Sequence, residues 1–343
     1  MHKAHPTPAH AAPATGPSAG NVRPHMRSMP LRVGTRGSPL ALWQTRHFLS
    51  LLTTFCPVLR SMEVFEEHVI RTTGDATQAA GTRLADIGGK GLFAKEIHEA
   101  LLDRRIDFAV HSLKDLETQM PPGIVLACTL KREDARDALI LGPDCAKPDP
   151  AHPYAALPPG AVIGTSSVRR QAQLLHARPD LQITVFRGNV QSRLGRVRAG
   201  DVGASLLAYA GLKRLGIGHE ADVLIDPEIM LPAACQGIVG ITVRADDTEL
   251  LELLAAIEDP AAKAVAAAER SLLDMLDGSC RTPIGGYARL DDDGTLHLTG
   301  LVARADGSYI LRRSLSGPAT DAVRIGITLG EQLRADAPRD IFA

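Results

Sequence analysis

The chain has 343 residues, a formal net charge of −1 and 45% hydrophobic residues, enough apolar content for the cores of two or three domains. This charge and the 3% aromatic content argue against a nucleic-acid-binding surface, which needs a wide basic field and stacking rings. The five cysteines show no CxxC spacing, so they indicate neither a disulfide framework nor a zinc site. No stretch reaches the roughly 18 apolar residues that span a bilayer. We therefore expect a cytoplasmic protein without a metal, a nucleic acid or a membrane partner.

Residues 1–30 are rich in Ala, Pro and His and contain no acid. This composition lacks the large apolar side chains that a core needs, so it predicts a disordered extension. The segment also lacks the apolar stretch of a secretory signal. A weak organellar address is the alternative, and the prolines argue against it because they break an amphipathic helix.

After this extension, short apolar strands alternate with helical patterns, which predicts the α/β class with parallel or mixed sheets covered by helices. Ser38 followed by Pro39 indicates a helix start, since a capping hydroxyl precedes a proline in the first turn. The apolar face expected for this helix consists of Leu40, Trp43, His47 and Leu51. Strands are expected at residues 31–34, 64–71, 106–111 and 124–130, and a helix at 93–102.

Two further units follow. Residues 144–160 contain five prolines and are expected to separate the first unit from the second, which has strands at 161–163 and 183–186. The third unit starts near residue 259 and is expected to contain helices at 261–275 and 321–334 and strands at 296–304 and 309–314. Polar residues gather after several strands, where open α/β sheets bind their ligands.

The second unit contains a dense group of arginines between residues 165 and 198, accompanied by a single acid, Asp180. Thr165 and Ser167 follow an apolar strand and open a helix, and hydroxyls and free N–H groups at a helix start bind anions. The group therefore indicates a pocket for a multiply anionic ligand, with a solvated basic face as the alternative. Its arginines are Arg169, Arg170, Arg178, Arg187, Arg193, Arg196 and Arg198.

The first unit repeats this arrangement, because Arg36 and Ser38 follow its first strand at a helix start. Lys114 and Asp115 come after another strand, where a carboxylate is suited to guide protons; a surface Lys-Asp pair is the equally weighted alternative. The sequence GGKG at residues 88–91 lacks the Walker spacing and is either a lid that brings Lys90 over a ligand or a plain turn.

One cysteine lies in a different context from the others. Cys280 sits in DGSCRTPI, in a loop after a helix, where the thiol is expected to be accessible and Arg281 favours the reactive thiolate. Cys56 and Cys128 lie in apolar contexts and are expected to fill the core.

Ten segments occur in the same order as in one enzyme family: GTRGSPLALWQT, TTGD, GGKGLFAKEIHEALL, DFAVHSLKDLE, REDARDALI, GTSSVRRQAQL, RGNVQSRL, AGLKRLG, LPAACQGIVGI and DGSCRTPIGGYA. From residue 31 nearly to its end, the chain closely resembles the porphobilinogen deaminases, or hydroxymethylbilane synthases, of tetrapyrrole and haem biosynthesis. The resemblance implies a monomeric transferase that condenses four porphobilinogen molecules head to tail, releases four ammonia molecules and hydrolyses the product to hydroxymethylbilane. The alternative is a non-catalytic, two-lobed anion receptor, which would need neither Cys280 nor Asp115 for chemistry.

The resemblance also implies roles for individual residues. Cys280 would carry a dipyrromethane cofactor through a thioether. Asp115 would be the catalytic carboxylate that stabilises the cationic azafulvene left after ammonia departs, and Lys90 is assigned to catalysis with it. The residues expected to hold the cofactor are Ser112, Lys114, Thr165, Ser167, Arg169, Arg170 and Gly188. Those expected to hold the substrate and the growing chain are Arg36, Ser38, Arg187, Arg193 and Arg214.

The implied architecture has three domains. The first two would resemble the lobes of type II periplasmic binding proteins, with mixed sheets and a ligand cleft between them, and the third would be a small α+β domain. Domain 1 would comprise residues 31–141 and 238–256, domain 2 residues 142–237, and domain 3 residues 259–343 with the Cys280 loop. The chain departs from the family at Leu116-Glu117, where many members have Val-Pro, and at Cys235, which raises the question whether that thiol faces the cleft.

Overall fold

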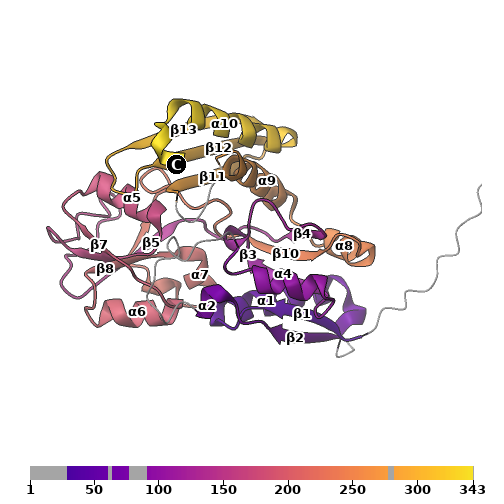
Figure 1. The fold of residues 1–343 in the computed structure, drawn as a ribbon. Coiled ribbons are helices and arrows are strands. Elements are labelled where there is room, and N and C mark those ends of the chain that lie inside the picture. Colours follow the sequence, from indigo (N-terminus) through magenta and orange to yellow (C-terminus); the bar gives the residue numbers. More distant parts are fainter. Residues whose placement is uncertain (1–28, 61–63, 77–90, 277–281, 343) are drawn as a thin grey trace, which may run out of the picture.

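A computed structural model of the chain describes residues 29–60, 64–76, 91–276 and 282–342. Within these ranges the chain forms two five-stranded mixed sheets and one three-stranded antiparallel sheet, flanked by helices. The sheets belong to two lobes and a third domain, which is coloured orange-brown to yellow and lies above the lobes in Figure 1. The predicted α/β class with three domains is confirmed.

The first lobe is built on a sheet with the strand order β2-β1-β3-β10-β4. Strand β1 is parallel to β2 and β3, whereas β10 is antiparallel to β3 and β4. Phe48 and Phe108 are fully buried in its core and meet edge to face, with ring centroids 5.4 Å apart. Its elements are β1 (Leu31–Thr35), α1 (Pro39–Phe55), β2 (Phe65–Val69), α2 (Thr73–Ala76), α4 (Lys95–Leu102), β3 (Phe108–Ser112), β4 (Ile124–Thr129), β10 (Val239–Arg244) and α8 (Thr248–Ala255).

The second lobe repeats this topology with the order β7-β6-β8-β5-β9. Strand β6 is parallel to β7 and β8, and β5 runs antiparallel to β8 and β9. In each lobe the antiparallel strand lies next to the edge and is reached by a crossing from the other lobe. The elements are β5 (Asp137–Leu141), β6 (Val162–Gly164), α5 (Val168–Ala177), β7 (Gln182–Thr184), α6 (Val190–Arg198), β8 (Ala204–Ala208), α7 (Tyr209–Arg214) and β9 (Val223–Ile225).

Two expected boundaries between the lobes are wrong. The chain was expected to stay in the first domain up to Leu141, but β5 is fully buried in the second sheet, so the crossing lies between β4 and β5. The proline-rich residues 144–160 connect β5 to β6 inside the second lobe. They are not a linker, because Tyr154 and Leu157 pack into the core of that lobe. The chain then returns to the first sheet through β10.

The third domain is a three-stranded antiparallel sheet covered by two helices, as expected for a small α+β domain. The helices pack closely because glycines face the contact: a side chain at Gly326 would meet the carbonyl oxygen of Ala268 at 2.3 Å. Its elements are α9 (Pro260–Met275), β11 (Ile284–Leu290), β12 (Thr295–Ala303), β13 (Ile310–Pro318) and α10 (Ala322–Asp336). Short 3₁₀ turns occur at η1 (Pro57–Arg60), η2 (Leu113–Asp115), η3 (Gly218–Glu220), η4 (Ala319–Asp321) and η5 (Arg339–Phe342).

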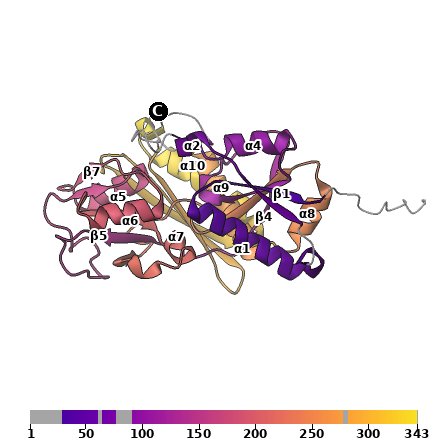
Figure 2. The ribbon, with the colours of Figure 1, turned by 90° about the horizontal axis from the view of Figure 1, so that it is seen from below.

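Helix α1 begins where the sequence predicts but buries a different face. Ser38 is its N-cap and accepts a hydrogen bond from the backbone N–H of Ala41 at 3.2 Å. The buried residues are Ala41, Gln44, Thr45, Phe48 and Leu52, not the expected set that starts at Leu40. Leu40 instead lies against Gly211 of α7. Figure 2 shows from below how α1 meets the second lobe at α7.

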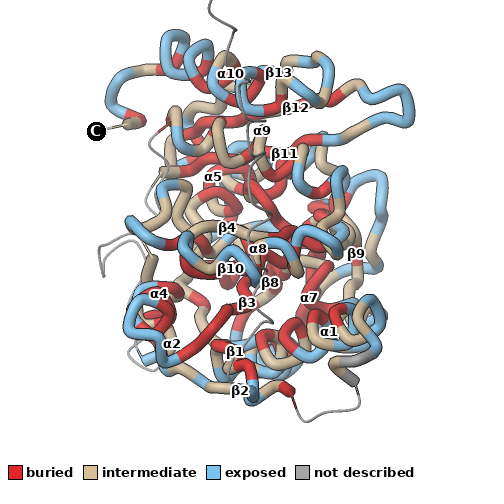
Figure 3. The backbone as a smooth tube through the Cα atoms, turned by 90° about the vertical axis from the view of Figure 1, so that its right-hand side faces the viewer, coloured by how far each residue is buried: buried red, intermediate tan, exposed pale blue. Residues whose placement is uncertain are grey.

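Burial follows the layers of the fold. Strands are mostly red (buried) in Figure 3, and the outward turns of the helices are pale blue (exposed).

Candidate active site

The two lobes bring polar strand ends toward one another. Strand β3 ends at Ser112 and passes directly into η2, which carries Lys114 and Asp115. Strand β6 ends at Gly164, and Thr165 and Ser167 then open α5. The N-cap hydroxyl of Ser167 accepts from the N–H of Arg170 at 3.4 Å, while the Thr165 hydroxyl accepts from the N–H of Ser167 at 3.1 Å. The predicted strand-end positions of both groups are therefore confirmed.

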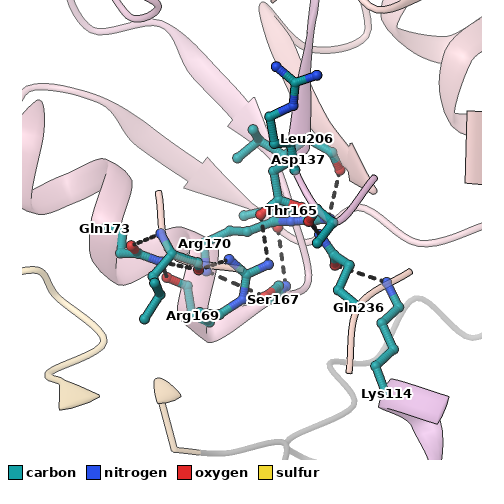
Figure 4. Close-up of polar contacts among 12 residues, drawn as sticks. Lys114, Asp137, Thr165, Ser167, Arg169, Arg170, Gln173, Leu206 and Gln236 are labelled. Atoms are coloured by element: carbon teal, nitrogen blue, oxygen red, sulfur yellow. Dashed lines mark hydrogen bonds and ion pairs between the residues drawn. The ribbon is translucent and has the colours of Figure 1, made fainter. Parts of the chain in front are cut away.

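Behind the start of α5, a buried carboxylate binds two of the predicted arginines (Figure 4). Asp137 has no exposed surface and accepts from Arg169 Nη2 at 2.8 Å and Arg170 Nη2 at 2.7 Å. Burial by itself would raise the pKa of Asp137, but the two guanidiniums outweigh it and hold this pKa below its ordinary value. The Asp137 carboxylate thus fixes the orientation of both arginines at the helix start.

Both arginines make further contacts with the backbone. Arg169 Nη1 donates to the carbonyl of Leu231 at 2.6 Å, and Arg170 Nη1 donates to the carbonyl of Leu206 at 2.8 Å. Arg170 Nε is buried without a hydrogen-bond partner in the described part of the chain. Because a buried donor without a partner is costly, this N–H group marks a place for a ligand acceptor.

Lys114 joins this network from the first lobe (Figure 4). Its Nζ donates to Gln236 Oε1 at 3.2 Å, and Gln236 Nε2 donates to Asp137 Oδ1 at 2.8 Å. Solvent reaches Lys114, yet protein groups surround its ammonium, and this desolvation lowers the pKa of Lys114 to about 8. The ammonium has no carboxylate partner within hydrogen-bonding distance among the described residues.

Asp115 lies beside an arginine whose charge is already shared. Arg36 makes two hydrogen bonds to Asp75, at 3.2 Å and 2.5 Å, and stacks over the ring of Phe93 at 4.2 Å. Its Nη1 is 3.8 Å from Asp115 Oδ2, too far for a hydrogen bond. The Asp115 side chain keeps 33% of its surface exposed, so solvent and small molecules can reach its carboxylate.

Of three further predicted arginines, Arg193 and Arg214 have no carboxylate partner in the described structure, and Arg187 contacts the backbone of the first lobe. Arg187 Nη2 donates to the carbonyl of Gly74 at 3.2 Å, a contact that joins the two lobes. Arg214 Nη2 donates to the carbonyl of Gly237 at 2.6 Å, and Arg193 Nε is buried without a hydrogen-bond partner. Burial lowers the pKa of Arg193 and of Arg214 to about 10. Bound carboxylates would relieve the cost of holding these charges partly out of water.

The remaining predicted site residues have mixed surroundings. Ser112 is hydrogen-bonded to Gln44 of α1, with 3.0 Å from Gln44 Nε2 to Ser112 Oγ. The Ser38 hydroxyl is used as a helix cap. Gly188 has a φ of 130°, a value that disfavours any side chain, and it directly precedes Asn189, the N-cap of α6.

Two of the assigned residues, Cys280 and Lys90, lie outside the described residues. Helix α9 ends at Met275 and β11 begins at Ile284, so these two elements flank the segment that carries Cys280. The question about Cys235 has a clear answer: this thiol is 2% exposed, packs in a core cluster, and burial raises its pKa to about 12. Cys235 therefore does not face the cleft. Cys128 is fully buried, as expected for a residue that fills the core, while Cys56 is half-buried.

Sequence reasoning missed the residues that orient the predicted ones. Asp137 and Gln236 connect the arginines to Lys114, and Asp75 binds Arg36. Asp137 carried a usable signal, since it is a single acid at the head of the apolar run Ala138–Leu141 of β5, where an unpaired charge would be costly. Gln236 and Asp75 carried none.

The described ranges contain neither a metal site nor a membrane-spanning helix. No group of three or more His, Cys, Asp or Glu side chains there is arranged to hold a metal ion. None of the helices in those ranges has the length and apolar character needed to cross a membrane.

Fold and site together define a two-lobed α/β protein in which a partly exposed carboxylate, Asp115, lies beside Arg36 at the end of a strand of the first lobe. Comparison of the sequence with known protein families identifies one family in two ranges of the chain. Residues 31–252 match the family described as "Porphobilinogen deaminase, dipyromethane cofactor binding domain", and residues 263–335 match "Porphobilinogen deaminase, C-terminal domain". The chain therefore belongs to the porphobilinogen deaminase family, as its sequence motifs indicated.

Individual members of this family are similar in sequence to the chain over most of their length. Porphobilinogen deaminase of Paracoccus denitrificans is 46% identical over 313 residues, which is 91% of this chain and 96% of that protein. Chloroplastic porphobilinogen deaminase of Oryza sativa is 44% identical over 314 residues, covering 91% of this chain and 85% of that protein. An arginine transport periplasmic binding protein from Legionella pneumophila covers 66% of this chain and 91% of its own, at 14% identity and a TM-score of 0.34. That similarity is too low to carry a conclusion, so the two-lobed architecture rests on the strand order.

Proposed function

We propose that this chain builds a linear tetrapyrrole by condensing four porphobilinogen molecules head to tail on a dipyrromethane primer, with release of four ammonia molecules and final hydrolysis to hydroxymethylbilane. The chain is a transferase of the porphobilinogen deaminase family with a small-molecule substrate. The observation that carries the proposal is the partly exposed carboxylate of Asp115, which makes only a long ion pair with Arg36, beside the Lys114 ammonium, which is hydrogen-bonded to a neutral amide. A receptor needs only the cations, whereas the condensation also needs the carboxylate.

The residues present fit a primer and substrates that each bear several carboxylates. Lys114 offers an ammonium bonded only to a neutral amide, and Arg170 offers a buried N–H group without a partner. Charge-assisted hydrogen bonds to carboxylates are the strong interactions that such donors form. We assign primer binding to Ser112, Lys114, Thr165, Ser167, Arg169, Arg170 and Gly188. We assign substrate binding to Arg36, Ser38, Arg187, Arg193 and Arg214.

The catalytic step places positive charge on a pyrrole ring. When the C–N bond of the protonated aminomethyl group breaks, ammonia leaves with the bonding electron pair and the positive charge passes to the pyrrole ring and its methylene carbon. A carbon–carbon bond to the next ring then forms, and the attacking ring carbon loses its proton. Asp115 is suited to stabilise the cation and to guide the proton, because Arg36 makes its hydrogen bonds to Asp75 and lies 3.8 Å from Asp115, which leaves the oxygens of Asp115 without a hydrogen bond from it. We also assign Lys90 to this step.

Cys280 is proposed as the primer attachment point, since its loop context in the sequence favours an accessible thiolate. The primer supplies a covalently held ring on which the chain grows. A thiol that must stay free for attachment fits a reducing cytoplasm, which we propose as the location. We further propose that the enzyme acts as a monomer, with the site formed by the lobes of one chain.

The experiment compares Asp115→Asn with the unsubstituted enzyme after mixing with limited porphobilinogen. We expect the adduct on Cys280 to persist and ammonia release to slow by about 10²–10³-fold, the usual cost of losing preorganised charge stabilisation. Asp144→Asn is a matched control, because Asp144 is exposed in the second lobe. Near-normal ammonia release by Asp115→Asn would remove this residue from catalysis.

A further inference from the structure

Gln236 is buried at the junction of the two lobes, in the segment that returns the chain to the first sheet. The residue is 1% exposed, and its side chain is hydrogen-bonded to three residues in two separate segments. Oε1 accepts from Lys114 Nζ at 3.2 Å, while Nε2 donates to the carbonyl of Ala135 at 2.7 Å and to Asp137 Oδ1 at 2.8 Å. Figure 4 shows the amide between Lys114 and Asp137.

These contacts allow only one orientation of the amide. Both N–H bonds of Nε2 point to oxygens that can only accept, so Oε1 must face the Lys114 ammonium, which can only donate. The reversed amide would set its NH₂ group against the ammonium and its oxygen against two acceptors. The second lobe therefore determines where the acceptor for Lys114 lies.

The backbone around Gln236 is held in an unusual conformation. Cys235 has a φ of 62°, which is unfavourable for a residue with a side chain, and Gly237 has a φ of 89°. A side chain at Gly237 would meet the carbonyl oxygen of Glu133 at 2.3 Å. The backbone N–H of Cys235 is in turn bonded to the buried carboxylate of Glu269. The surrounding structure thus fixes the position from which the Gln236 side chain projects.

We propose that Gln236 positions Lys114, holding its ammonium against the second lobe so that it faces the same ligand carboxylates as Arg169 and Arg170. The inference rests on the assignment of Lys114 to primer binding under Proposed function. A neutral amide suits this role, because it orients the ammonium without neutralising it. A carboxylate in its place would compete with the ligand and would repel Asp137.

The charged groups near Lys114 give the position a measurable signature. Desolvation is the largest influence and lowers the pKa of Lys114 to about 8. Asp115 on its own segment and Asp137 on β5 favour the charged ammonium, whereas Arg169 and Arg170 on α5 oppose it. Without its hydrogen bond to Gln236, the ammonium would leave these protein groups for the solvent that already reaches the Lys114 side chain. Its pKa would then rise toward the ordinary lysine value of about 10.4.

The test is trace acetylation of lysines in the full-length chain produced without porphobilinogen, using acetic anhydride over a range of pH and mass spectrometry of the Lys114 peptide. The midpoint of the labelling curve reports the pKa of Lys114, whereas its plateau reports accessibility. In Gln236→Met we expect the midpoint to rise and labelling at pH 8 to fall roughly tenfold, as an upward pKa change of somewhat more than one unit requires. A merely structural role would change the plateau and leave the midpoint in place.

Gln173→Met is the matched control, since Gln173 is a buried amide that binds Leu231 and does not contact Lys114. An unchanged or lowered midpoint in Gln236→Met, or an equal rise in Gln173→Met, would overturn the inference. If Gln236→Met does not fold, Gln236→Asn keeps the amide but withdraws it by one methylene, and the same rise is expected. Because labelling needs no turnover, its outcome is independent of whether the chain condenses porphobilinogen.

Discussion

The substitution Asp137→Asn removes the single buried charge that opposes two buried arginines. The Asp137 side chain is fully buried and accepts hydrogen bonds from Arg169, Arg170 and Gln236 at 2.7–2.8 Å. Asparagine keeps the size but can accept at only one side-chain atom, and it leaves both guanidiniums buried without a counter-charge. Removing one partner of a buried ion pair commonly costs about 3–5 kcal/mol.

Hydrogen exchange of backbone amides in α5 and β8 measures this loss within the second lobe, without assuming that all three domains unfold together. A loss of about 3–5 kcal/mol corresponds to a fall in protection of roughly 10²–10⁴-fold, at one factor of ten per 1.36 kcal/mol. The effect should also depend on pH in one direction. Because the folded pKa of Asp137 lies below its ordinary value, its stabilisation is present above about pH 4 and is lost as pH falls below that, so the two proteins should converge in acid.

The control is Asp144→Asn, which changes the same side chain at an exposed position of the same lobe and should alter stability by less than about 0.5 kcal/mol. If Asp137→Asn lowered protection less than tenfold, or if the difference did not shrink in acid, the charge pairing assigned to Asp137 would be refuted.

Three further outcomes are expected. Cys280→Ser should carry no pyrrole adduct by intact mass, because a hydroxyl is a far weaker nucleophile than a thiolate, while Cys56→Ser should carry it; an adduct on Cys280→Ser would remove the attachment assignment. Arg187→Gln should keep the adduct and give shorter enzyme-bound ladders after limited substrate, whereas the exposed Arg196→Gln should match the unsubstituted enzyme. Glu269→Gln weakens both the buried ion pair with Arg132 and the hydrogen bonds that Glu269 accepts from two backbone N–H groups. It should lower the free energy of unfolding in urea by about 3 kcal/mol, and a loss below about 1 kcal/mol would contradict this role of Glu269.

Local signals in the sequence were enough to predict where the helices and strand ends of the site lie. Ser38 with Pro39 and the Thr165–Ser167 segment mark helix starts, because capping depends on neighbouring residues only. Strand-end logic likewise put Lys114 and Asp115 at the edge where a ligand would bind. The specific roles of Lys114 and Asp115 came from the family resemblance. From residue type alone, a catalytic pair and an ordinary surface pair were equally good interpretations.

Features that depend on distant partners were not readable in advance. Strand β5 is a plain apolar run, and only its pairing with β8 and β9 shows that it belongs to the second lobe. Its first residue, Asp137, binds arginines 32 and 33 positions away, and Gln236 reaches it from 99 positions away. The face of α1 that is buried was misjudged for a related reason, because Leu40 packs against α7 of the other lobe. Such pairings arise only when the chain has folded and the crossings between lobes are in place.

Covalent chemistry on porphobilinogen distinguishes the proposed enzyme from a receptor that only binds anions. The most direct measurement is the intact mass of the purified full-length chain, before and after addition of a few equivalents of porphobilinogen. We expect a covalent adduct of two pyrrole rings at Cys280 and, after substrate, a ladder of species that each carry one more ring. An unmodified mass in both samples, with porphobilinogen bound only reversibly, would contradict it and identify the chain as a receptor.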